Sequence, residues 1–297
     1  MRTLCLGEAL VDLICERPVA SLPEADAFAP HFGGATANVA VIAAKAGGGV
    51  ALAGGTGDDP WGRWLTDRLG ASGVDLTWFA AMEGKQTPVA FVSIDATGEP
   101  TYQIYGDAIS LALEAVADRL PEAVEQCDGL FFGSNTLVGE HERAFTRAAR
   151  DRALELGRPV IFDPNLRLHR WRSVTAAAAE ANACVPGALL VRCNRAEAEV
   201  MTRESDPDAA AAALLKAGAK AVVITLGAEG AILRGAIKAD VPGVPARVVS
   251  TVGAGDALMG VLVARLSQTG YYAPAIAAAL PEAVAEGARA CERWGAV

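Results

Sequence analysis

The chain has 297 residues, of which 52% are apolar and 21% charged, and its net charge is −9. That balance is typical of a globular protein with ample material for a core, in one large domain or two small ones. The acidic excess argues against nucleic acid and anionic membranes as partners, because both need a basic face.

The six cysteines are scattered without a C-x-x-C pair, and the three histidines show no metal-ligand spacing. We therefore expect buried, reduced cysteines in a cytoplasmic protein. Glu8 and Asp12 interrupt the apolar stretch near the start, which argues against a signal peptide. No run of about 18 apolar residues occurs, so no transmembrane helix is expected.

The first predicted elements are a short strand at 3–6 and an apolar run at 9–14 that carries one acid, Asp12. Burying an unpaired carboxylate is costly. Asp12 is therefore either an exposed position on a half-buried edge strand or an acceptor for substrate hydroxyls, and the sequence leaves both readings open.

A glycine turn at Gly33 and Gly34 runs into a predicted helix that ends in a glycine cluster near residue 47. Asn38 lies in the first turns of that helix. Because Asn is a poor residue for a helix interior, we expect its side chain to have a specific partner. The elements that follow are a strand at 50–53, a turn at 54–59 and a helix at 61–70.

Residues 74–107 are rich in β-branched and aromatic residues on alternating faces, with a turn at 95–100. This pattern predicts an antiparallel hairpin layer that is separate from the main sheet. Together with residues 8–32 it is expected to form a small lid.

From about residue 110 the chain alternates between helices and strands. The predicted helices are 111–125, 140–156, 173–184, 208–216 and 257–268, and the predicted strands are 129–132, 159–162, 188–193, 221–225, 230–234 and 244–249. Such alternation predicts a parallel sheet with helices on both faces. In these sheets ligands bind beyond the carboxyl ends of the strands.

Polar residues gather where the predicted strands end. Asp163, Asn165 and Arg167 follow one strand, Asn194 and Glu197 a second, and Thr225 and Gly227 a third. A single polar residue in such a place is usually a turn former or a helix cap. Several clusters on one sheet edge, joined by the glycine turn at 253–255, indicate a ligand site.

The run Gly253-Ala254-Gly255-Asp256 opens the last predicted helix. Its free N–H groups and the positive end of the helix dipole form an anion site suited to phosphate. A phosphate would repel Asp256, so this carboxylate is better suited to take a proton from a hydroxyl that attacks phosphorus. Taken alone, the run is also compatible with an ordinary helix cap. It completes neither a Walker-type loop nor G-x-G-x-x-G, because Leu258 stands in place of the third glycine.

Two motifs in this order resemble the PfkB (ribokinase-like) family of carbohydrate kinases, and bacterial fructokinases in particular. They are Gly33-Gly34-Ala35-Thr36-Ala37-Asn38 and Gly253-Ala254-Gly255-Asp256, with Asp163-Pro164-Asn165-Leu166-Arg167, Asn194-x-x-Glu197 and Thr225-Leu226-Gly227 between them. The resemblance runs nearly end to end. It implies one domain over 1–297, an α/β fold in three α/β/α layers with a mostly parallel sheet, and a β-sheet lid that often helps to form a homodimer. It also implies ATP-dependent phosphorylation of a sugar hydroxyl.

The resemblance gives each motif residue a role. Asp256 would be the general base, and the amides of Gly253, Ala254 and Gly255 would form the anion hole for the transferred phosphoryl group. Glu197 would hold Mg²⁺ through water, and the ATP site would be lined by Asn194, Thr225, Gly227, Gly230 and Gly255. The sugar would be held by Asp12, Gly33, Gly34, Asn38, Tyr105, Arg167 and Asp256. Some relatives need a monovalent cation such as K⁺, and Ser250, in place of a common acidic residue, leaves that open.

Departures from the family pattern bear on the substrate. Many relatives carry an Arg just after the lid aromatic, whereas this chain has Gly106 and Asp107 after Tyr105. Asp107 would repel an acid, which favours a neutral sugar and places fructose first. The alternatives are a sugar acid such as 2-keto-3-deoxygluconate, another ketose or a nucleoside, and, more remotely, a non-catalytic sugar or nucleotide sensor. A usual C-terminal tail is missing after 294–296, which leaves the last wall of the adenine pocket unassigned.

Overall fold

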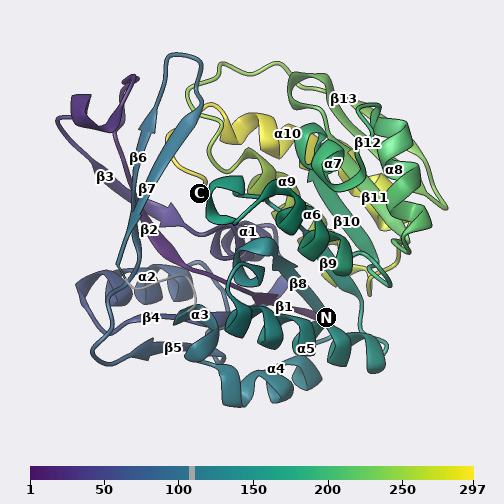
Figure 1. Ribbon diagram of the computed structural model, residues 1–297, viewed down its shortest axis with the longest axis horizontal. Helices are drawn as coiled ribbons and strands as arrows, with labels where there is room; N and C mark the ends of the chain where they lie inside the picture. Colours follow the sequence, from purple (N-terminus) through teal and green to yellow (C-terminus); the bar gives the residue numbers. More distant parts are fainter. Residues whose placement is uncertain (107–110) are drawn as a thin grey trace.

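A large, mostly parallel sheet forms the centre of the computed structural model, which describes residues 1–106 and 111–297 (Figure 1). Its strands are β1 (Arg2–Leu6), β4 (Gly49–Gly57), β5 (Phe79–Met82), β8 (Gly129–Gly133), β9 (Val160–Asp163), β10 (Leu190–Asn194), β11 (Ala221–Thr225), β12 (Gly230–Gly235) and β13 (Ala239–Pro242). They pair in the order β13-β12-β11-β10-β9-β8-β1-β4-β5. All neighbours from β11 to β5 are parallel, and β12 and β13 add an antiparallel edge.

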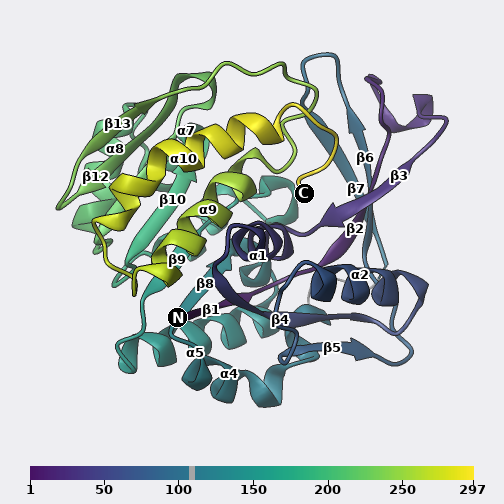
Figure 2. The same cartoon turned by 180° about the vertical axis from the view of Figure 1, so that it is seen from behind.

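Helices cover both faces of this sheet, which gives the three layers that the sequence predicted (Figures 1 and 2). One face carries α3 (Leu111–Glu114), α4 (Leu120–Gln126), α5 (Glu140–Glu155), α6 (Val174–Ala183), α7 (Arg195–Thr202) and α8 (Pro207–Lys216). The other carries α1 (Ala35–Lys45), α2 (Pro60–Ala71), α9 (Ala254–Gln268) and α10 (Ala275–Ala290).

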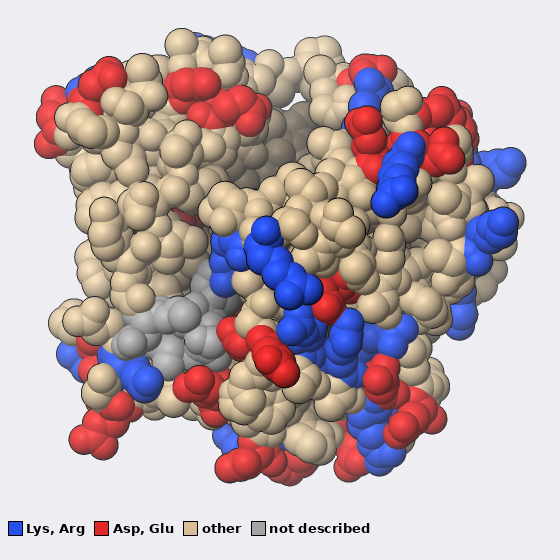
Figure 3. Space-filling model, in the orientation of Figure 1, with Lys and Arg blue, Asp and Glu red and all other residues tan. Residues whose placement is uncertain are grey.

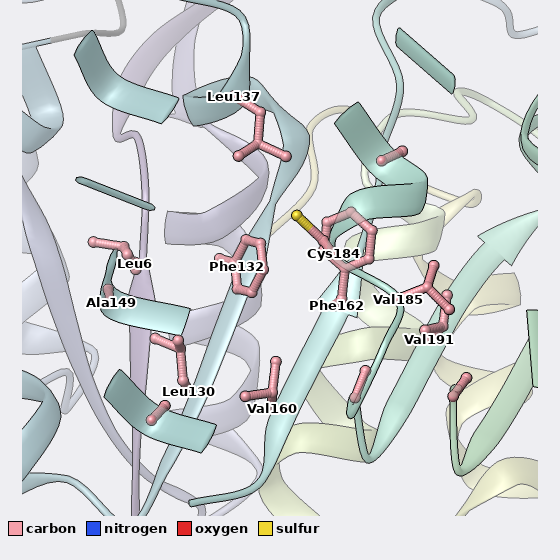
Figure 4. Packing of buried hydrophobic residues seen from close by; sticks show 14 of the residues in the cluster. Leu6, Leu130, Phe132, Leu137, Ala149, Val160, Phe162, Cys184, Val185 and Val191 are labelled. Carbon is pink, nitrogen blue, oxygen red and sulfur yellow. The ribbon is translucent and has the colours of Figure 1, made fainter. Parts of the chain in front are cut away.

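An apolar core fills the space between the sheet and each helix layer. Phe132 of β8 and Phe162 of β9 are fully buried, with ring centroids 5.0 Å apart, and Figure 4 shows them among Leu130, Val160 and Leu6. Strands covered on both faces need apolar residues at successive positions, and this explains runs such as the one in β9. Five of the six cysteines are buried and none forms a disulfide, in line with their reading as small core residues.

A second, four-stranded sheet lies beside the large one (Figure 1). It contains β2 (Leu10–Ile14), β3 (Ala29–Gly33), β6 (Val89–Ile94) and β7 (Pro100–Tyr105), in the order β3-β2-β6-β7. The β6–β7 hairpin turns at Asp95, whose side chain accepts hydrogen bonds from the amides of Thr97 and Glu99. This sheet occupies the place of the predicted lid and forms one wall of the cavity described below.

The structure corrects several element boundaries. Residues 79–82, assigned from the sequence to the hairpin layer, form β5 and pair with β4 in the large sheet. The predicted turn at 54–59 is wrong over residues 54–57, because β4 continues to Gly57. Gly54 and Gly57 permit this, since a Cβ on either would collide with a backbone carbonyl of a neighbouring segment.

Other differences lie in the second half of the chain. The predicted helix at 111–125 is broken into α3, a 3-10 helix at Ala117–Arg119 and α4. The strand expected at 244–249 is absent from the described fold, and β13 forms earlier. The sequence reading assigned no element to α10, which contains Pro281. No helix in the described ranges has the length and hydropathy needed to cross a bilayer.

Candidate active site

A cavity of about 760 Å³ opens between the small sheet and the carboxyl ends of the parallel strands. Figure 3 shows basic side chains beside a hollow near the middle of this face. The cavity brings together most of the residues that the sequence singled out: Asp12, Gly34, Asn38, Arg167, Asn194, Glu197, Gly253, Gly255 and Asp256. They come from both ends of the chain and from both sheets, which supports the inference that they form one site.

Asp256 lies in the first turn of α9 and is held by Asn38 of α1. Asn38 Nδ2 donates to Asp256 Oδ2 at 2.9 Å, so the expected partner of this buried asparagine is found. Burial raises the pKa of Asp256 to about 6, against the opposing effects of the Asn38 hydrogen bond and the Arg167 charge. A carboxyl group with a pKa near the working pH is suited to accept a proton from a substrate hydroxyl.

Asp12 faces the same cavity from β2. The strand is paired on both sides, with β3 and β6, and Asp12 is only 4% exposed, so the reading as an exposed edge position is wrong. Burial, and then the charge of Asp256, raise the pKa of Asp12 well above its ordinary value, while Arg167 lowers it. Gly33 makes room for this carboxyl group, because a Cβ there would lie 2.6 Å from Asp12 Oδ1.

The glycine turn at 253–255 leads into the N-terminus of α9. Gly253 is the N-cap residue with φ 77°, a left-handed conformation that favours glycine, and a Cβ there would collide with Ala296. Gly253 and Gly255 line the cavity. Ala254 does not, and its amide donates to the Thr251 carbonyl oxygen at 3.3 Å.

Arg192 is a cavity residue that the sequence reading missed. It lies inside β10 and is 8% exposed, with Nη1 donating to Asp163 Oδ2 at 2.9 Å and Nη2 to Thr225 Oγ1 at 2.8 Å. A Cβ on Gly255 would lie 2.7 Å from Nη1, so the guanidinium packs against the glycine turn. The sequence does contain an indication of this residue, because Arg192 is the single arginine inside an otherwise apolar predicted strand. Burying an arginine side chain is costly unless the charge is paired.

Glu197 is the candidate metal residue. It forms a capping box with Asn194 at the start of α7, and its two carboxylate oxygens accept from the amides of Leu166 and Asn194 at 2.7 and 2.9 Å. Burial and the charge of Asp163 raise its pKa. Across the described ranges no cluster of three or more acidic, histidine or cysteine residues could enclose a metal. One fixed carboxylate on the cavity wall fits Mg²⁺ that keeps most of its water ligands.

Glu8, Asn135 and Arg170 form a second group that the sequence reading did not identify. Glu8 Oε1 accepts from the amide of Ala35 at 3.1 Å and from Asn135 Nδ2 at 2.8 Å. Arg170 Nη1 in turn donates to Asn135 Oδ1 at 2.9 Å. All three line the cavity. Glu8 could have been identified from the sequence, because it is an acidic residue directly after the first predicted strand.

The structure does not bring Tyr105 into the cavity. Its side chain is 57% exposed and its ring stacks edge-on against Phe91, with centroids 5.6 Å apart, over a separate hollow that Phe28 also lines. Tyr102 of the same strand lines the cavity instead, and its ring centroid is 5.9 Å from Arg167 Cζ. Asp107, which entered the argument for a neutral sugar, lies outside the described residues.

The predicted nucleotide residues after β11 stand apart from the cavity lining. Thr225, the last residue of β11, accepts a hydrogen bond from Arg192 of the lining, whereas Gly227 begins the 3-10 turn after β11 and Gly230 is the first residue of β12. Both have positive φ, and a Cβ on Gly230 would collide with the carbonyl of Val241. Gly230 is therefore needed for the close approach of β12 and β13.

Comparison with known proteins identifies relatives over nearly the whole chain. Residues 2–290 match the family described as pfkB family carbohydrate kinase. Fructokinase-1 of Oryza sativa subsp. japonica is 34% identical over 268 residues, which are 88% of this chain and 82% of the rice protein. The fructokinase of Rhizobium leguminosarum bv. trifolii is 32% identical over 285 residues, covering 94% and 84% of the two chains.

A solved structure shares the whole fold. It is a double mutant of the fructokinase from Vibrio cholerae O395 in a form bound to fructose, ADP and a potassium ion. The TM-score is 0.84 at 29% sequence identity, with 99% of this chain and 93% of that chain covered.

Proposed function

The chain belongs to the pfkB family of carbohydrate kinases, and from this premise we propose that it phosphorylates fructose with ATP, using Asp256 as the general base. The observation that carries the proposal is the place of Asp256. It lies where an anion-binding helix terminus meets a cavity lined by polar groups from the small sheet and α1. Its pKa of about 6 leaves it ionised, and able to take a proton, at neutral pH.

In this proposal each wall of the cavity has its own task. Asp12 and Asn38 hold hydroxyl groups of the sugar, and Asn38 also orients the Asp256 carboxylate. Asp256 takes the proton of the hydroxyl that attacks the γ-phosphorus. The amides of Gly253 and Gly255, at the positive end of α9, stabilise the charge on the transferred phosphoryl group. Arg192 adds a fixed positive charge behind the same turn.

Mg²⁺ is the proposed divalent cofactor, and Glu197 is the residue that would hold it through water. When bound, the ion would neutralise charge on the ATP phosphates. Glu197 is suited to this because backbone amides fix both of its oxygens while its side chain still borders the cavity. Asn194, which caps α7 beside it, is the proposed nucleotide contact, with Thr225, Gly227 and Gly230 farther along the same edge.

A monovalent cation is a further proposed cofactor, supported by the potassium ion in the Vibrio cholerae structure. In this chain Ser250 is fully buried, and its Oγ accepts from the amide of Val252 at 3.1 Å. Higher turnover in KCl than in tetramethylammonium chloride at equal ionic strength would support the requirement. Equal turnover in the two salts would show that turnover does not require K⁺.

We also propose that the domain spans 1–297 and pairs with a second copy through the outer face of its lid. That face carries the hollow between Phe28, Phe91 and Tyr105, where large apolar side chains meet solvent. Analytical ultracentrifugation should show a dimer for the wild type and a monomer for Tyr105→Glu. A monomeric wild type would contradict this assembly.

The test of the function is ADP release from MgATP with fructose, ribose, tagatose, 2-keto-3-deoxygluconate and adenosine as acceptors. We expect the highest kcat/KM with fructose, and loss of turnover in Asp256→Asn without a fall in melting temperature. Undiminished turnover in that variant would remove Asp256 from the mechanism. Absence of ADP release with every acceptor would favour a sugar or nucleotide sensor on the same fold.

A further inference from the structure

The helix that carries Asn38 begins at a glycine, which has no side chain to cap it. The N-cap residue of α1 is Gly34, with φ 90°, a left-handed conformation that favours glycine. A Cβ at this position would lie 2.6 Å from the carbonyl oxygen of Glu8, so a larger capping residue does not fit there. Because the first amides of a helix have no partner within it, acceptors from another segment must satisfy them.

Glu8, in the connection between β1 and β2, supplies two of these acceptors. Its side-chain Oε1 accepts from the amide of Ala35 at 3.1 Å, and its carbonyl oxygen accepts from the amide of Ala37 at 3.3 Å. The carboxylate also lies at the positive end of the α1 dipole, where a negative charge is stabilised. Glu8 is therefore a cap for α1 that comes from 27 positions away in the chain.

A second set of contacts fixes the carboxylate of Glu8 itself. Asn135, in the segment after β8, donates from Nδ2 to Glu8 Oε1 at 2.8 Å, and its Oδ1 accepts from Arg170 Nη1 at 2.9 Å. The amide of Asn135 therefore has one orientation that satisfies both neighbours. The charge of Arg170 also attracts that of Glu8. These interactions hold a carboxylate that is only 3% exposed in one position at the start of α1.

The first turn of α1 connects this anchored start to the proposed base. Asn38 lies less than one turn after Ala35, and its Nδ2 donates to Asp256 Oδ2 at 2.9 Å. A displacement of α1 by about 1 Å would stretch this contact beyond the range of a hydrogen bond. We propose that Glu8 is a positioning residue, which fixes the start of α1 and so aims the Asn38 amide at Asp256. The inference rests on the proposed function, in which Asp256 is the general base, and it requires no contact between Glu8 and the substrate.

The test measures the pKa of Asp256 directly, by ¹³C NMR of protein labelled at its aspartate carboxyl groups. The Asp256 signal is the one that Asp256→Asn removes. In Glu8→Ala the first turn of α1 loses its side-chain acceptor, so the bond from Asn38 should lengthen. The pKa of Asp256 should then rise by up to about one pH unit, as for loss of a hydrogen bond to a charged group. The acidic limb of kcat/KM for fructose should move with it.

Two further variants separate the position of Glu8 from its charge. Glu8→Gln keeps an oxygen acceptor for the Ala35 amide and should leave the pKa of Asp256 at the wild-type value. Glu8→Asp keeps the charge on a shorter side chain that cannot reach the amide, and it should raise that pKa. If Glu8 acted through its charge alone, Glu8→Ala and Glu8→Gln would both lower the pKa of Asp256, and Glu8→Asp would leave it unchanged. That pattern would overturn the proposal. Every variant retains the other charged groups that act on Asp256, which are Asp12 of β2, Asp163 of β9, Arg167 after β9 and Arg192 of β10.

A double variant tests whether Glu8 acts through Asn38. In Asn38→Ala the bond to Asp256 is already absent, so adding Glu8→Ala should cause no further rise in the pKa of Asp256. Additive rises would show that Glu8 acts by another route and would overturn the proposal. Asp206→Ala is the matched control, because Asp206 caps α8 on the opposite face by accepting from the Ala209 amide at 2.8 Å. It should lower the melting temperature and leave the pKa of Asp256 unchanged.

The titration needs no substrate, so failure of this inference is distinguishable from failure of the proposed function. A wild-type protein that turns over fructose, with the same pKa of Asp256 in Glu8→Ala and Glu8→Asp as in the wild type, would overturn the role of Glu8 alone. A protein that phosphorylates no acceptor would contradict the proposed function, and the titration would still decide whether Glu8 positions Asn38.

Discussion

Asn38 and Asp256, 218 positions apart, meet through a hydrogen bond of 2.9 Å between Nδ2 and Oδ2. The bond joins the first turn of α1 to the first turn of α9 and so connects the two glycine turns of the chain. Since burial alone would raise the pKa of Asp256 further, the Asn38 donor keeps the proposed base ionised near neutral pH. The geometry of α1 is therefore linked directly to the chemistry at α9.

The first prediction concerns the pH dependence of turnover. With a pKa of about 6, Asp256 loses its proton as pH rises through 6, so kcat/KM for fructose should fall about tenfold for each pH unit below that value. Asn38→Ala removes a donor that lowers the pKa, so the acidic limb should move to higher pH. The measurement is kcat/KM against pH for both proteins.

Asn182 provides the control for this experiment. Its Nδ2 donates to the Met201 carbonyl oxygen between α6 and α7, away from the cavity. Asn182→Ala should leave the acidic limb in its wild-type position. An acidic limb that does not move in Asn38→Ala would mean that the bond to Asp256 has no effect on the group that titrates.

The second prediction is that Asp12→Asn stabilises the protein while it weakens sugar binding. The raised pKa of Asp12 means that its ionised form is disfavoured in the folded state. This destabilisation is present above the folded-state pKa and disappears as pH falls below the unfolded value. At pH 8 the variant should therefore melt a few degrees higher than the wild type. Near pH 3.5 the difference should vanish.

Melting temperatures at the two pH values, with KM for fructose, test this prediction together. A lower melting temperature at pH 8 would show that Asp12 has a stabilising partner in solution. An unchanged KM for fructose would show that Asp12 does not contribute to sugar binding, whatever the effect of the substitution on stability.

The third prediction compares two glycines with similar backbones and different surroundings. Gly253 and Gly157 both have positive φ, 77° and 67°. A Cβ on Gly253 would collide with Ala296, whereas no atom of the described residues lies within 4 Å of a Cβ on Gly157. Gly157→Ala should cost about 1 kcal/mol of unfolding free energy from backbone strain alone. Gly253→Ala should cost more and should also abolish turnover, because the turn must shift.

Urea unfolding and fructose turnover of the two variants provide the comparison. Equal losses of stability would mean that the C-terminal segment moves aside without cost. Retained turnover in Gly253→Ala would contradict the role of this turn as the anion hole.

Several residues that the sequence singled out lie together in the cavity, and they are the ones whose position follows from local pattern. Glycine turns before helices, and polar residues at strand ends, predicted Asn38, Glu197 and Asp256, because parallel strands bring their carboxyl ends to one edge. The long sequence separation between Asn38 and Asp256 did not prevent the prediction, because each residue lies near the start of its own predicted helix.

The residues that were missed depend on register and on tertiary packing. The resemblance predicts Tyr105 at the sugar site, but Tyr102 lines the cavity instead. Successive side chains of a strand point to opposite faces, so a difference of one residue in register determines which tyrosine of β7 faces the cavity. Arg192 was hidden in an apolar strand, because only the fold brings Asp163 and Thr225 to its guanidinium. Arg170 likewise depends on Asn135, which follows a different strand.

The last prediction concerns the buried pair of Arg192 and Asp163. Both are nearly inaccessible to solvent, so Arg192→Leu would leave the Asp163 carboxylate unpaired next to Glu197. Removing one partner of such a pair typically costs about 3–5 kcal/mol. Arg192→Leu combined with Asp163→Asn should recover part of that loss, because the Asp163 carboxylate is then no longer buried without a partner. Urea unfolding at pH 8 measures all three proteins.

A surface arginine separates this effect from a general loss of charge. Arg289 pairs with Glu286 on α10 and its side chain is 58% exposed, so Arg289→Leu should change stability by less than about 1 kcal/mol. If Arg192→Leu cost no more than Arg289→Leu, water must reach Asp163, and Arg192 could not supply a desolvated charge behind Gly255. If the double variant were less stable than Arg192→Leu, Asp163 must stabilise the fold through another contact, such as the one from its Oδ1 to the amide of Asn165.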